Sequence, residues 1–347
     1  MALRARVRRL ISWPEAAVER LVPRGEGPPV LDPYRGFATP DRLVVRGRVL
    51  TALRRSTPEP DQSRWANLRQ MAALFLTREV AGLGVRIPEV GVEGKTDAEG
   101  YLWLEVPRAG FEPGWRELAV EIDGLPQSRR GFPVLVPHPE ASLGVISDVD
   151  DTLIETGAYS LARNLWTTFT GSALTRKVYP DAVTLLGVLA GGGRNPVFYV
   201  SSSPWNLHHF LDGVLADAGL PPGPMFLRDF GMGAGEGLEK SGRGGHREHK
   251  GAAIDRVLEA NPELRFVLVG DTGQKDAFVY RDAIARHAGR IRAVVLREPG
   301  PGPSPASREA MAAIAAAGVE LHHGVDYSGA ITGLGGASPS NPCAESG

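Results

Sequence analysis

The sequence contains one cysteine and almost no net charge. That cysteine, Cys343, lies among serine, proline and asparagine near the C-terminal end. One cysteine cannot form an internal disulfide framework or a zinc site built from several thiolates. The 39 lysines and arginines nearly balance the 40 aspartates and glutamates, which leaves a formal net charge of −1. Because the chain has no overall basic field, we expect no nucleic-acid partner.

Long apolar stretches are also missing. No run approaches the roughly 20 residues needed to span a bilayer, so we expect no transmembrane segment. The N-terminus also lacks the apolar core of about 7–15 residues that marks a secretory signal, and a cytoplasmic protein is therefore expected. The 347 residues suffice for two domains with substantial cores. No pattern in the sequence indicates the oligomeric state.

Residues 1–29 are predicted to form a basic amphipathic segment. Leu3, Val7 and Leu10 recur at helical spacing among several arginines, and the pattern breaks near Pro14. A helix of this kind either docks on its own domain or lies on an anionic membrane surface. Both interpretations stay open, so peripheral association with a membrane is an alternative to a purely cytoplasmic location.

Residues 30–140 are predicted to form a smaller β-sandwich-like domain. Apolar residues alternate with polar or small ones over 117–122, which is typical of a half-buried strand. Further strands are predicted at 43–53, 101–106 and 132–136, and one helix near 65–76. Short strands with frequent glycine and proline favour a sandwich. Nothing in this region carries a catalytic pattern.

After residue 140 the pattern changes to strands that alternate with helices, which is typical of a parallel sheet with crossover helices. The predicted strands cover 143–147, 196–201, 265–270 and 291–296. The predicted helices cover 181–190, 205–218, 250–260 and 275–287, followed by an alanine-rich helix near 307–317 and one more strand. We therefore expect an α/β domain at 141–330 and a disordered tail at 331–347.

An acidic cluster follows the first of these strands. Asp148, Asp150 and Asp151 lie within four residues, and Thr152 closes the set. Neighbouring carboxylates repel one another and are retained at low cost where they are solvated or bind a cation. At the carboxyl end of a parallel strand, a hard divalent metal is the expected partner. The alternative is an acidic turn that caps the next helix.

Polar residues also follow later strands or begin later helices. The second predicted strand ends in three serines that start at Ser201, and Lys250 begins a helix. A third strand ends in Asp271, with Asp276 close behind. Each pattern alone suits an ordinary turn or cap. At one edge of a parallel sheet, however, they would supply a nucleophile, an acid/base, phosphate-binding donors and metal-binding acids, as phosphoryl transfer requires.

These motifs resemble those of the haloacid-dehalogenase-like (HAD) phosphatases. Longer strings resemble more specifically the family of the yeast actin-patch phosphatidate phosphatase and its bacterial relatives. The strings are Ser-Asp-Val-Asp-Asp-Thr-Leu, Tyr-Val-Ser-Ser-Ser-Pro-Trp, Phe-Leu-Arg-Asp-Phe, His-Lys and Val-Gly-Asp-Thr-Gly-Gln-Lys-Asp. The resemblance covers about residues 140–300 and extends loosely over the β-rich region. It implies a HAD-like Rossmannoid parallel sheet and a phosphatidate phosphatase that releases diacylglycerol and phosphate.

The resemblance also implies roles for individual residues. Asp148 would be the nucleophile that forms an aspartyl-phosphate. Asp150 would act as general acid and then general base, held in position by Thr152. Ser201 would donate a hydrogen bond to a phosphoryl oxygen. Lys250 would neutralise charge on the phosphoryl group and on the nucleophile.

The resemblance further implies a Mg²⁺ ion, whose charge offsets the repulsion between an anionic nucleophile and an anionic phosphate. Its ligands would be Asp148, the main-chain carbonyl of Asp150, and Asp271, with waters completing an octahedron. Asp276 would be a supporting acid. Its spacing from Asp271 is wider than in many members of the superfamily, although the narrower family shares it.

The substrate is less well defined than the chemistry. The segments between the motifs are too short for a large separate cap domain, and an open site suits a macromolecular or membrane-embedded phosphate. The expected partner is thus a phosphorylated substrate, in particular a lipid at a membrane surface. Ser202 and Arg228 are candidate substrate-binding residues. Trp166, Trp205 and Phe230 are interpreted either as contacts for acyl chains or as core residues.

Two alternative functions stay open. One is the same chemistry on a soluble phosphoester or a phosphoprotein, which the nucleophile motif cannot distinguish. The other belongs to a different class, a phospho-acceptor switch that binds partners without turnover. The second acid two residues after Asp148, and the serine that ends the neighbouring strand, favour turnover over the switch.

Overall fold

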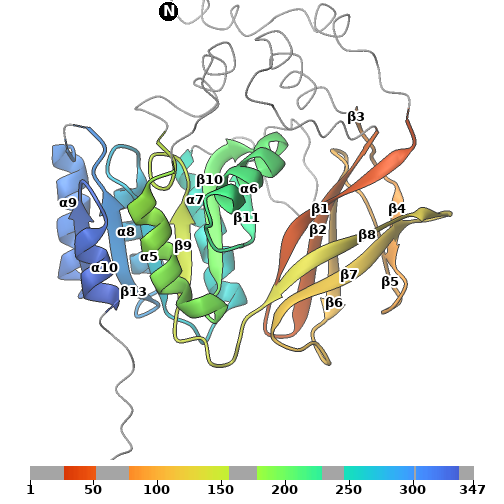
Figure 1. The fold of residues 1–347 in the computed structure, drawn as a ribbon, viewed down its shortest axis with the longest axis horizontal. Coiled ribbons are helices and arrows are strands. Elements are labelled where there is room, and N and C mark those ends of the chain that lie inside the picture. The colour runs from red at the N-terminus through yellow and green to blue at the C-terminus, as the bar shows by residue number, and fades with distance from the viewer. Residues whose placement is uncertain (1–26, 52–77, 156–177, 229–245, 301, 336–347) are drawn as a thin grey trace, which may run out of the picture.

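The computed structural model describes residues 27–51, 78–155, 178–228, 246–300 and 302–335. These residues form two β-sheets in succession along the chain, and helices cover only the second sheet (Figure 1). The last strand of the first sheet ends at Val136, and the first strand of the second sheet begins at Gly144. The helices predicted near the N-terminus and at 65–76 lie outside the described residues.

The first sheet is eight-stranded and barrel-like, with strand order β3-β2-β1-β8-β7-β4-β5 and β6 paired to β2. Its neighbours are antiparallel except for β1 and β8, which pair in parallel. The strands are β1 (Pro29–Ala38), β2 (Arg42–Thr51), β3 (Arg78–Glu79), β4 (Gly84–Ile87), β5 (Val92–Lys95), β6 (Tyr101–Pro107), β7 (Gly114–Ile122) and β8 (Leu125–Val136). The predicted strands are thus confirmed, and Leu118, Val120 and Ile122 face the core as their alternation indicates.

The prediction of a smaller β-sandwich needs a correction. All eight strands are hydrogen-bonded into one sheet, which has more strands than the parallel sheet that follows. Alternation shows that each strand has one buried face, but it does not show which strand is its neighbour. A curled single sheet and two stacked sheets therefore give the same sequence pattern.

The second sheet is six-stranded and wholly parallel, with strand order β11-β10-β9-β12-β13-β14. Its strands are β9 (Gly144–Asp148), β10 (Val197–Pro204), β11 (Met225–Arg228), β12 (Phe266–Asp271), β13 (Ile291–Arg297) and β14 (Glu320–Gly324). The prediction of an α/β domain with a parallel sheet is confirmed. β9 lies between β10 and β12, so the three strands that carry the predicted motifs are immediate neighbours.

Helices cover both faces of this sheet. One face packs on α5 (Pro180–Ala190), α6 (His208–Asp217) and α10 (Ser328–Gly335), and the other on α7 (His246–Ala260), α8 (Asp276–Arg286) and α9 (Pro305–Ala316). Successive residues of a strand point to opposite faces, so Val145 joins the first apolar cluster and Ile146 the second. The predicted helices are confirmed. α10 was not predicted, and residues 331–335 are helical instead of part of a disordered tail.

The two sheets are joined by a packed interface. The Tyr34 ring from β1 stacks on Trp205 with ring centroids 4.8 Å apart. Trp205 follows β10 directly, in the short 3₁₀ helix Trp205–Leu207, and is 6% exposed. The guanidinium of Arg46 in β2 lies 4.7 Å from the centroid of the Phe226 ring and donates to the Met225 carbonyl. Trp205 is therefore a core residue, whereas Trp166 and Phe230 lie outside the described residues.

Candidate active site

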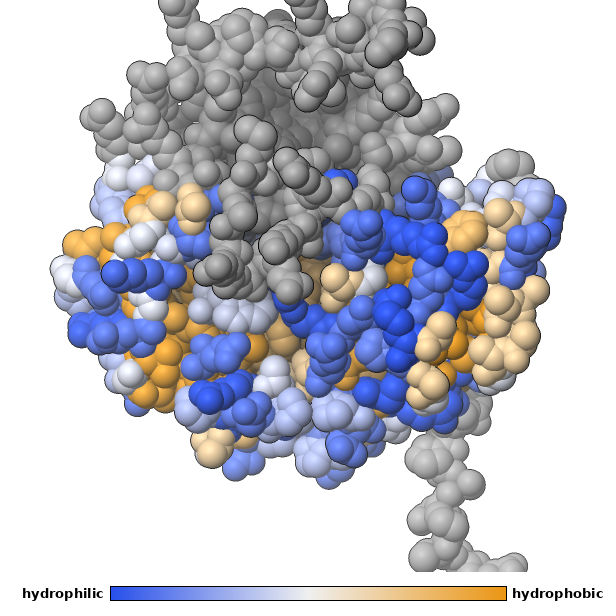
Figure 2. All heavy atoms as spheres, turned by 180° about the vertical axis from the view of Figure 1, so that it is seen from behind, coloured by the Kyte–Doolittle hydropathy of each residue, from blue (hydrophilic) through white to orange (hydrophobic). Residues whose placement is uncertain are grey.

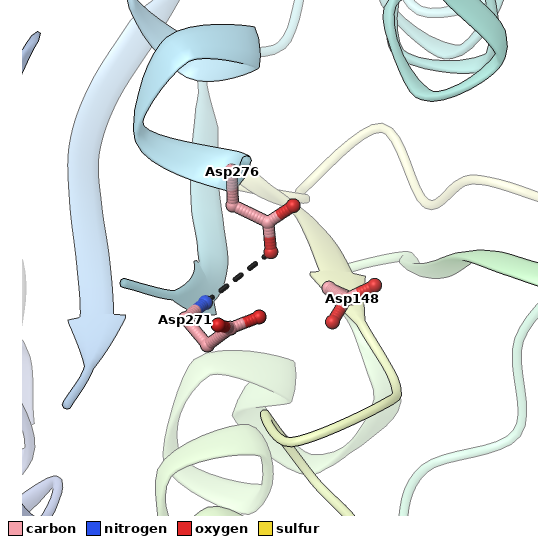
Figure 3. A group of neighbouring side chains, drawn as sticks. All are labelled: Asp148, Asp271 and Asp276. Carbon is pink, nitrogen blue, oxygen red and sulfur yellow. Dashed lines mark hydrogen bonds between the residues drawn. The ribbon is translucent and has the colours of Figure 1, made fainter. Parts of the chain in front are cut away.

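Asp148 is the last residue of β9, at the carboxyl edge of the parallel sheet. Because neighbouring parallel strands end at the same edge, Asp271 at the end of β12 lies beside it. Asp276 begins α8 and points back toward the same place. Figure 3 shows these three carboxylates facing one another from two strand ends and a helix start. The predicted acids are thus brought together, and all three are buried.

Lys250 provides the positive charge in this group. Its Nζ lies 2.6 Å from Asp148 Oδ1 and 2.6 Å from Asp276 Oδ1. Burial alone would lower the pKa of Lys250, but the carboxylates of Asp148, Asp276 and Asp271 outweigh it and raise that pKa above its usual value. The ammonium therefore stays charged at physiological pH. The site then holds one cation against three carboxylates.

Burial also controls the acids. It raises the pKa of Asp148 well above the usual range, an effect that Lys250 opposes and Asp276 reinforces. Burial, followed by the charge of Asp276, raises the pKa of Asp271 to about 8. The main-chain N–H of Asp271 donates to Asp276 Oδ2 at 3.2 Å, the bond drawn in Figure 3, and that of Gln274 donates to Asp271 Oδ1 at 2.7 Å. When ionised, these buried carboxylates would carry more negative charge than their protein partners neutralise, which is why their pKa values rise in the absence of a cation.

The donor set fits a hard divalent cation. One carboxylate oxygen from each of Asp148, Asp271 and Asp276 lies within 4.8 Å of the others. Asp271 Oδ2 is buried and has no hydrogen-bond partner among the described residues. An oxygen in that state costs free energy unless a cation or water binds it. Carboxylate oxygens that converge in this way are the ligands that such cations prefer.

Asp150 is held by two serine hydroxyls. Its Oδ2 accepts hydrogen bonds from Ser201 Oγ at 2.9 Å and from Ser203 Oγ at 3.1 Å. Its main-chain carbonyl, expected as a metal ligand, accepts a hydrogen bond from Gln274 Nε2 at 3.1 Å. Ser203 belongs to the serine run noted in the sequence but was given no role of its own, and Gln274 was not singled out. Both lie inside the family motifs, but a single polar residue in a turn does not by itself indicate a contact with Asp150.

The contact made by Thr152 differs from the expected contact with Asp150. Its hydroxyl donates to Asp148 Oδ2 at 2.9 Å, so it positions the nucleophile candidate and not Asp150. The chain reverses through Asp151, whose φ of 59° lies in the left-handed region that aspartate tolerates. The N–H groups of Leu153 and Ile154 then both donate to the Val149 carbonyl. This tight turn brings Thr152 back over the end of β9.

The two predicted substrate-binding residues lie on the neighbouring strands. Ser202 is half-buried in β10, and its Oγ has no hydrogen-bond partner within the described ranges. Arg228 ends β11 and pairs with Pro204 of β10. His249 lies nearby, and burial lowers its pKa to about 4 although it is hydrogen-bonded to the main chain of Phe226 and Ser201. The imidazole is therefore neutral at physiological pH and adds no charge beside the site.

At the carboxyl edge of the sheet, buried Lys250 thus lies between two acids, and Asp150 accepts hydrogen bonds from two serines. Three carboxylates converge there in a geometry that suits a cation. Residues 143–298 match the model of a family described as the catalytic domain of phosphatidate phosphatase APP1. The resemblance to the APP1 family is confirmed. The prediction of a phosphoric monoester hydrolase agrees with the description of this family. All site residues described above lie within the matched segment.

A curated relative also points to the APP1 family. Phosphatidate phosphatase APP1 of Saccharomyces cerevisiae is 27% identical over 207 residues, which cover 59% of this chain and 34% of the yeast protein. The chain therefore spans about a third of the length of the curated relative it matches. The family segment begins at residue 143, after the barrel-like sheet has ended.

Proposed function

We propose that this protein is a Mg²⁺-dependent phosphatase that forms an aspartyl-phosphate on Asp148. The observation that carries the proposal is the buried contact of Lys250 with Asp148 and Asp276, beside the unpartnered oxygen of Asp271. A HAD-like Rossmannoid arrangement is proposed with it. The position of β9 between β10 and β12 supports that arrangement, because it puts the nucleophile, Ser201 and Asp271 on adjacent strands.

Asp148 would attack the phosphorus atom, and the bond to the leaving alkoxide would break. Lys250 on Oδ1 and Thr152 on Oδ2 fix the carboxylate and limit its rotation. Asp150 would protonate the leaving alkoxide and then remove a proton from the water that hydrolyses the aspartyl-phosphate. The Ser201 hydroxyl donates to Asp150 in the free protein and would turn to a phosphoryl oxygen when substrate enters.

Asp148, Asp271 and Asp276 would hold Mg²⁺, with the Asp150 carbonyl as a further candidate ligand. When bound, the ion would supply the positive charge that lets an anionic carboxylate approach a phosphate dianion. The protein provides for this by burying the acids, which excludes water from the reacting groups. Asp276 also binds Lys250, so it would connect the metal ligands to the ammonium.

Phosphatidate is the proposed substrate, with diacylglycerol and phosphate as products. The family description and the name of the yeast relative support this choice. Among the described residues, no helix is long and apolar enough to cross a membrane. We propose, as a separate expectation from the sequence, that the protein reaches its lipid from the cytoplasmic side as a peripheral enzyme. A soluble phosphoester or phosphoprotein is the alternative substrate, and it would use the same residues.

The test is phosphate release by the purified protein, with and without Mg²⁺. Phosphatidate in mixed micelles and para-nitrophenyl phosphate are compared in one assay, alongside the Asp148→Asn variant. Mg²⁺-dependent release that the variant abolishes supports the mechanism, and the ratio of the two rates shows whether the lipid is preferred. Stable labelling of Asp148 by acetyl phosphate without turnover would instead favour a phospho-acceptor switch. Absence of any phosphate chemistry would overturn the proposal.

A further inference from the structure

Tyr327 lies outside the segment that matches the family, immediately before α10. Its side chain is buried, with 1% of its surface exposed. The phenolic hydroxyl donates a hydrogen bond of 2.9 Å to the main-chain carbonyl of Thr152. Burial raises the pKa of Tyr327 well above its usual value, so the hydroxyl stays protonated and remains a donor. A residue near the end of the described chain thus reaches the turn after β9.

That turn orients Asp148. The Thr152 hydroxyl donates to Asp148 Oδ2, while the Thr152 carbonyl accepts from Tyr327. The Val149 carbonyl accepts from Leu153 within the turn, whereas the carbonyls of Asp150 and Thr152 each accept from a side chain distant in sequence, those of Gln274 and Tyr327. Thr152 is completely buried, so its carbonyl cannot exchange a lost partner for bulk water. Tyr327 therefore restrains Thr152, which in turn restrains Asp148.

The tyrosine is itself held in place. Its main-chain N–H donates to Asp181 Oδ2 at 2.9 Å, and the same oxygen accepts from Arg297 Nη1 at 2.8 Å. Asp181 lies in the first turn of α5, and α10 packs beside α5 on the same face of the sheet (Figure 1). The Arg297 guanidinium lies 5.1 Å from the centroid of the Tyr327 ring. Elements from both ends of the α/β domain thus fix the phenol.

We propose that Tyr327 is a positioning residue that fixes the nucleophile Asp148 through Thr152. The inference rests on the proposed phosphatase function, since Asp148 must be the attacking group. The phenol does not touch the reacting atoms. Its effect is to limit the movement of the turn, so that Asp148 Oδ1 and Oδ2 keep their orientation toward the phosphorus atom.

The experiment compares Tyr327→Phe with Tyr199→Phe. Tyr199 is a matched control, because it is also buried and donates to a main-chain carbonyl, that of Pro221, at the opposite edge of the sheet. With para-nitrophenyl phosphate and saturating Mg²⁺, well below the melting temperatures of both variants, Tyr327→Phe should lower kcat about tenfold and leave KM within about twofold. Tyr199→Phe should retain the wild-type kcat even if its melting temperature falls.

Amide hydrogen exchange over residues 149–155 gives a readout that does not need turnover. Exchange there should be faster in Tyr327→Phe than in Tyr199→Phe. An unchanged kcat in folded Tyr327→Phe, or an equal loss in both variants, would overturn the inference while the wild-type activity leaves the proposed function standing. Inactive wild-type protein would overturn the proposed function itself. If Tyr327→Phe does not fold, Asp181→Ala removes the oxygen that accepts from the Tyr327 N–H, and an unchanged kcat in that variant overturns the inference.

Discussion

The ammonium of Lys250 lies 2.6 Å from a carboxylate oxygen of Asp148, and neither group is in contact with bulk water. Lys250 lies on α7, far from Asp148 in sequence, and its side chain reaches Asp148 across the carboxyl edge of the sheet. One contact thus sets both the orientation of the nucleophile candidate and the charge that faces the substrate.

Replacing Lys250 by methionine should lower kcat by at least about 100-fold. The variant removes the positive charge next to the phosphoryl group, and it also removes the ammonium that opposes the raised pKa of Asp148. Phosphate release from para-nitrophenyl phosphate is the measurement. Lys275→Met is the control, because Lys275 is exposed and should tolerate the change. A loss smaller than tenfold in Lys250→Met would contradict the assigned role.

The metal-free protein should become less stable as pH rises from about 6.5 to 8. The pKa of Asp271 is raised to about 8, so the native state holds a proton that the unfolded chain has already lost, and stability falls as pH rises through this range. Asp148 acts in the same direction. His249, with its pKa lowered to about 4, acts in the opposite direction but only below about pH 6.5. The loss from Asp271 is on the order of 1 kcal/mol per pH unit.

Melting temperatures in EDTA, measured across this pH range, test that expectation. Addition of Mg²⁺ should raise the melting temperature most at pH 8, because the ion binds the deprotonated carboxylates. Asp271→Asn is the control and should flatten both responses. A melting temperature that rises with pH in EDTA would show that the buried acids are already ionised without metal.

Replacing Ser203 by alanine should affect substrates according to their leaving group. Ser203 Oγ donates to Asp150 Oδ2, so its loss loosens the proposed general acid. An alkoxide leaving group needs protonation, whereas para-nitrophenolate leaves without it. We expect the rate of aspartyl-phosphate formation, measured in single turnovers, to fall roughly fivefold to tenfold for phosphatidate or another alkyl phosphate and to change little for para-nitrophenyl phosphate. The hydrolysis step, in which Asp150 would be the base, should slow equally for both substrates. Equal losses in the formation step for both substrates would argue against Asp150 as the acid.

Replacing Tyr34 by alanine should destabilise the protein by about 3 kcal/mol and also lower activity. The substitution removes the ring that stacks on Trp205, directly after the serines that hold Asp150. Urea unfolding and phosphate release measured on the same samples provide the test. Tyr34→Phe keeps the ring and should lose much less of both. Full activity in Tyr34→Ala would mean that the β-rich domain does not support the site.

Much of the α/β domain could be predicted from its sequence because strand and helix patterns alternate without interruption there. The strand ends at Asp148, Ser201 and Asp271 could be placed at one edge, since parallel strands leave no other arrangement. The pairing of strands in the barrel-like sheet could not be predicted, because alternation contains no information about neighbours. β11 is too short, and α10 too rich in glycine, for their periodicity to be recognised.

The finer details of the site depend on distances that spacing does not reveal. The family resemblance implied that Thr152 holds Asp150, but the left-handed turn at Asp151 directs the Thr152 hydroxyl to Asp148. The Ser203 hydroxyl donates to the side chain of Asp150, and the Gln274 side chain donates to the main-chain carbonyl of Asp150. No motif specifies either contact. Tyr327 lies C-terminal to all of the family motifs, so only the three-dimensional structure reveals its contact with Thr152.

The interface between the two sheets has a consequence for unfolding. Tyr34 and Tyr101 belong to the same apolar cluster as α5 and α6, while Phe37 and Val44 belong to the cluster beneath α7 and α8. Each side of the parallel sheet is therefore completed by side chains from the barrel-like sheet. The two units should melt together in a single cooperative transition, and a chain that begins at β9 should expose Trp205 and Phe226 and aggregate.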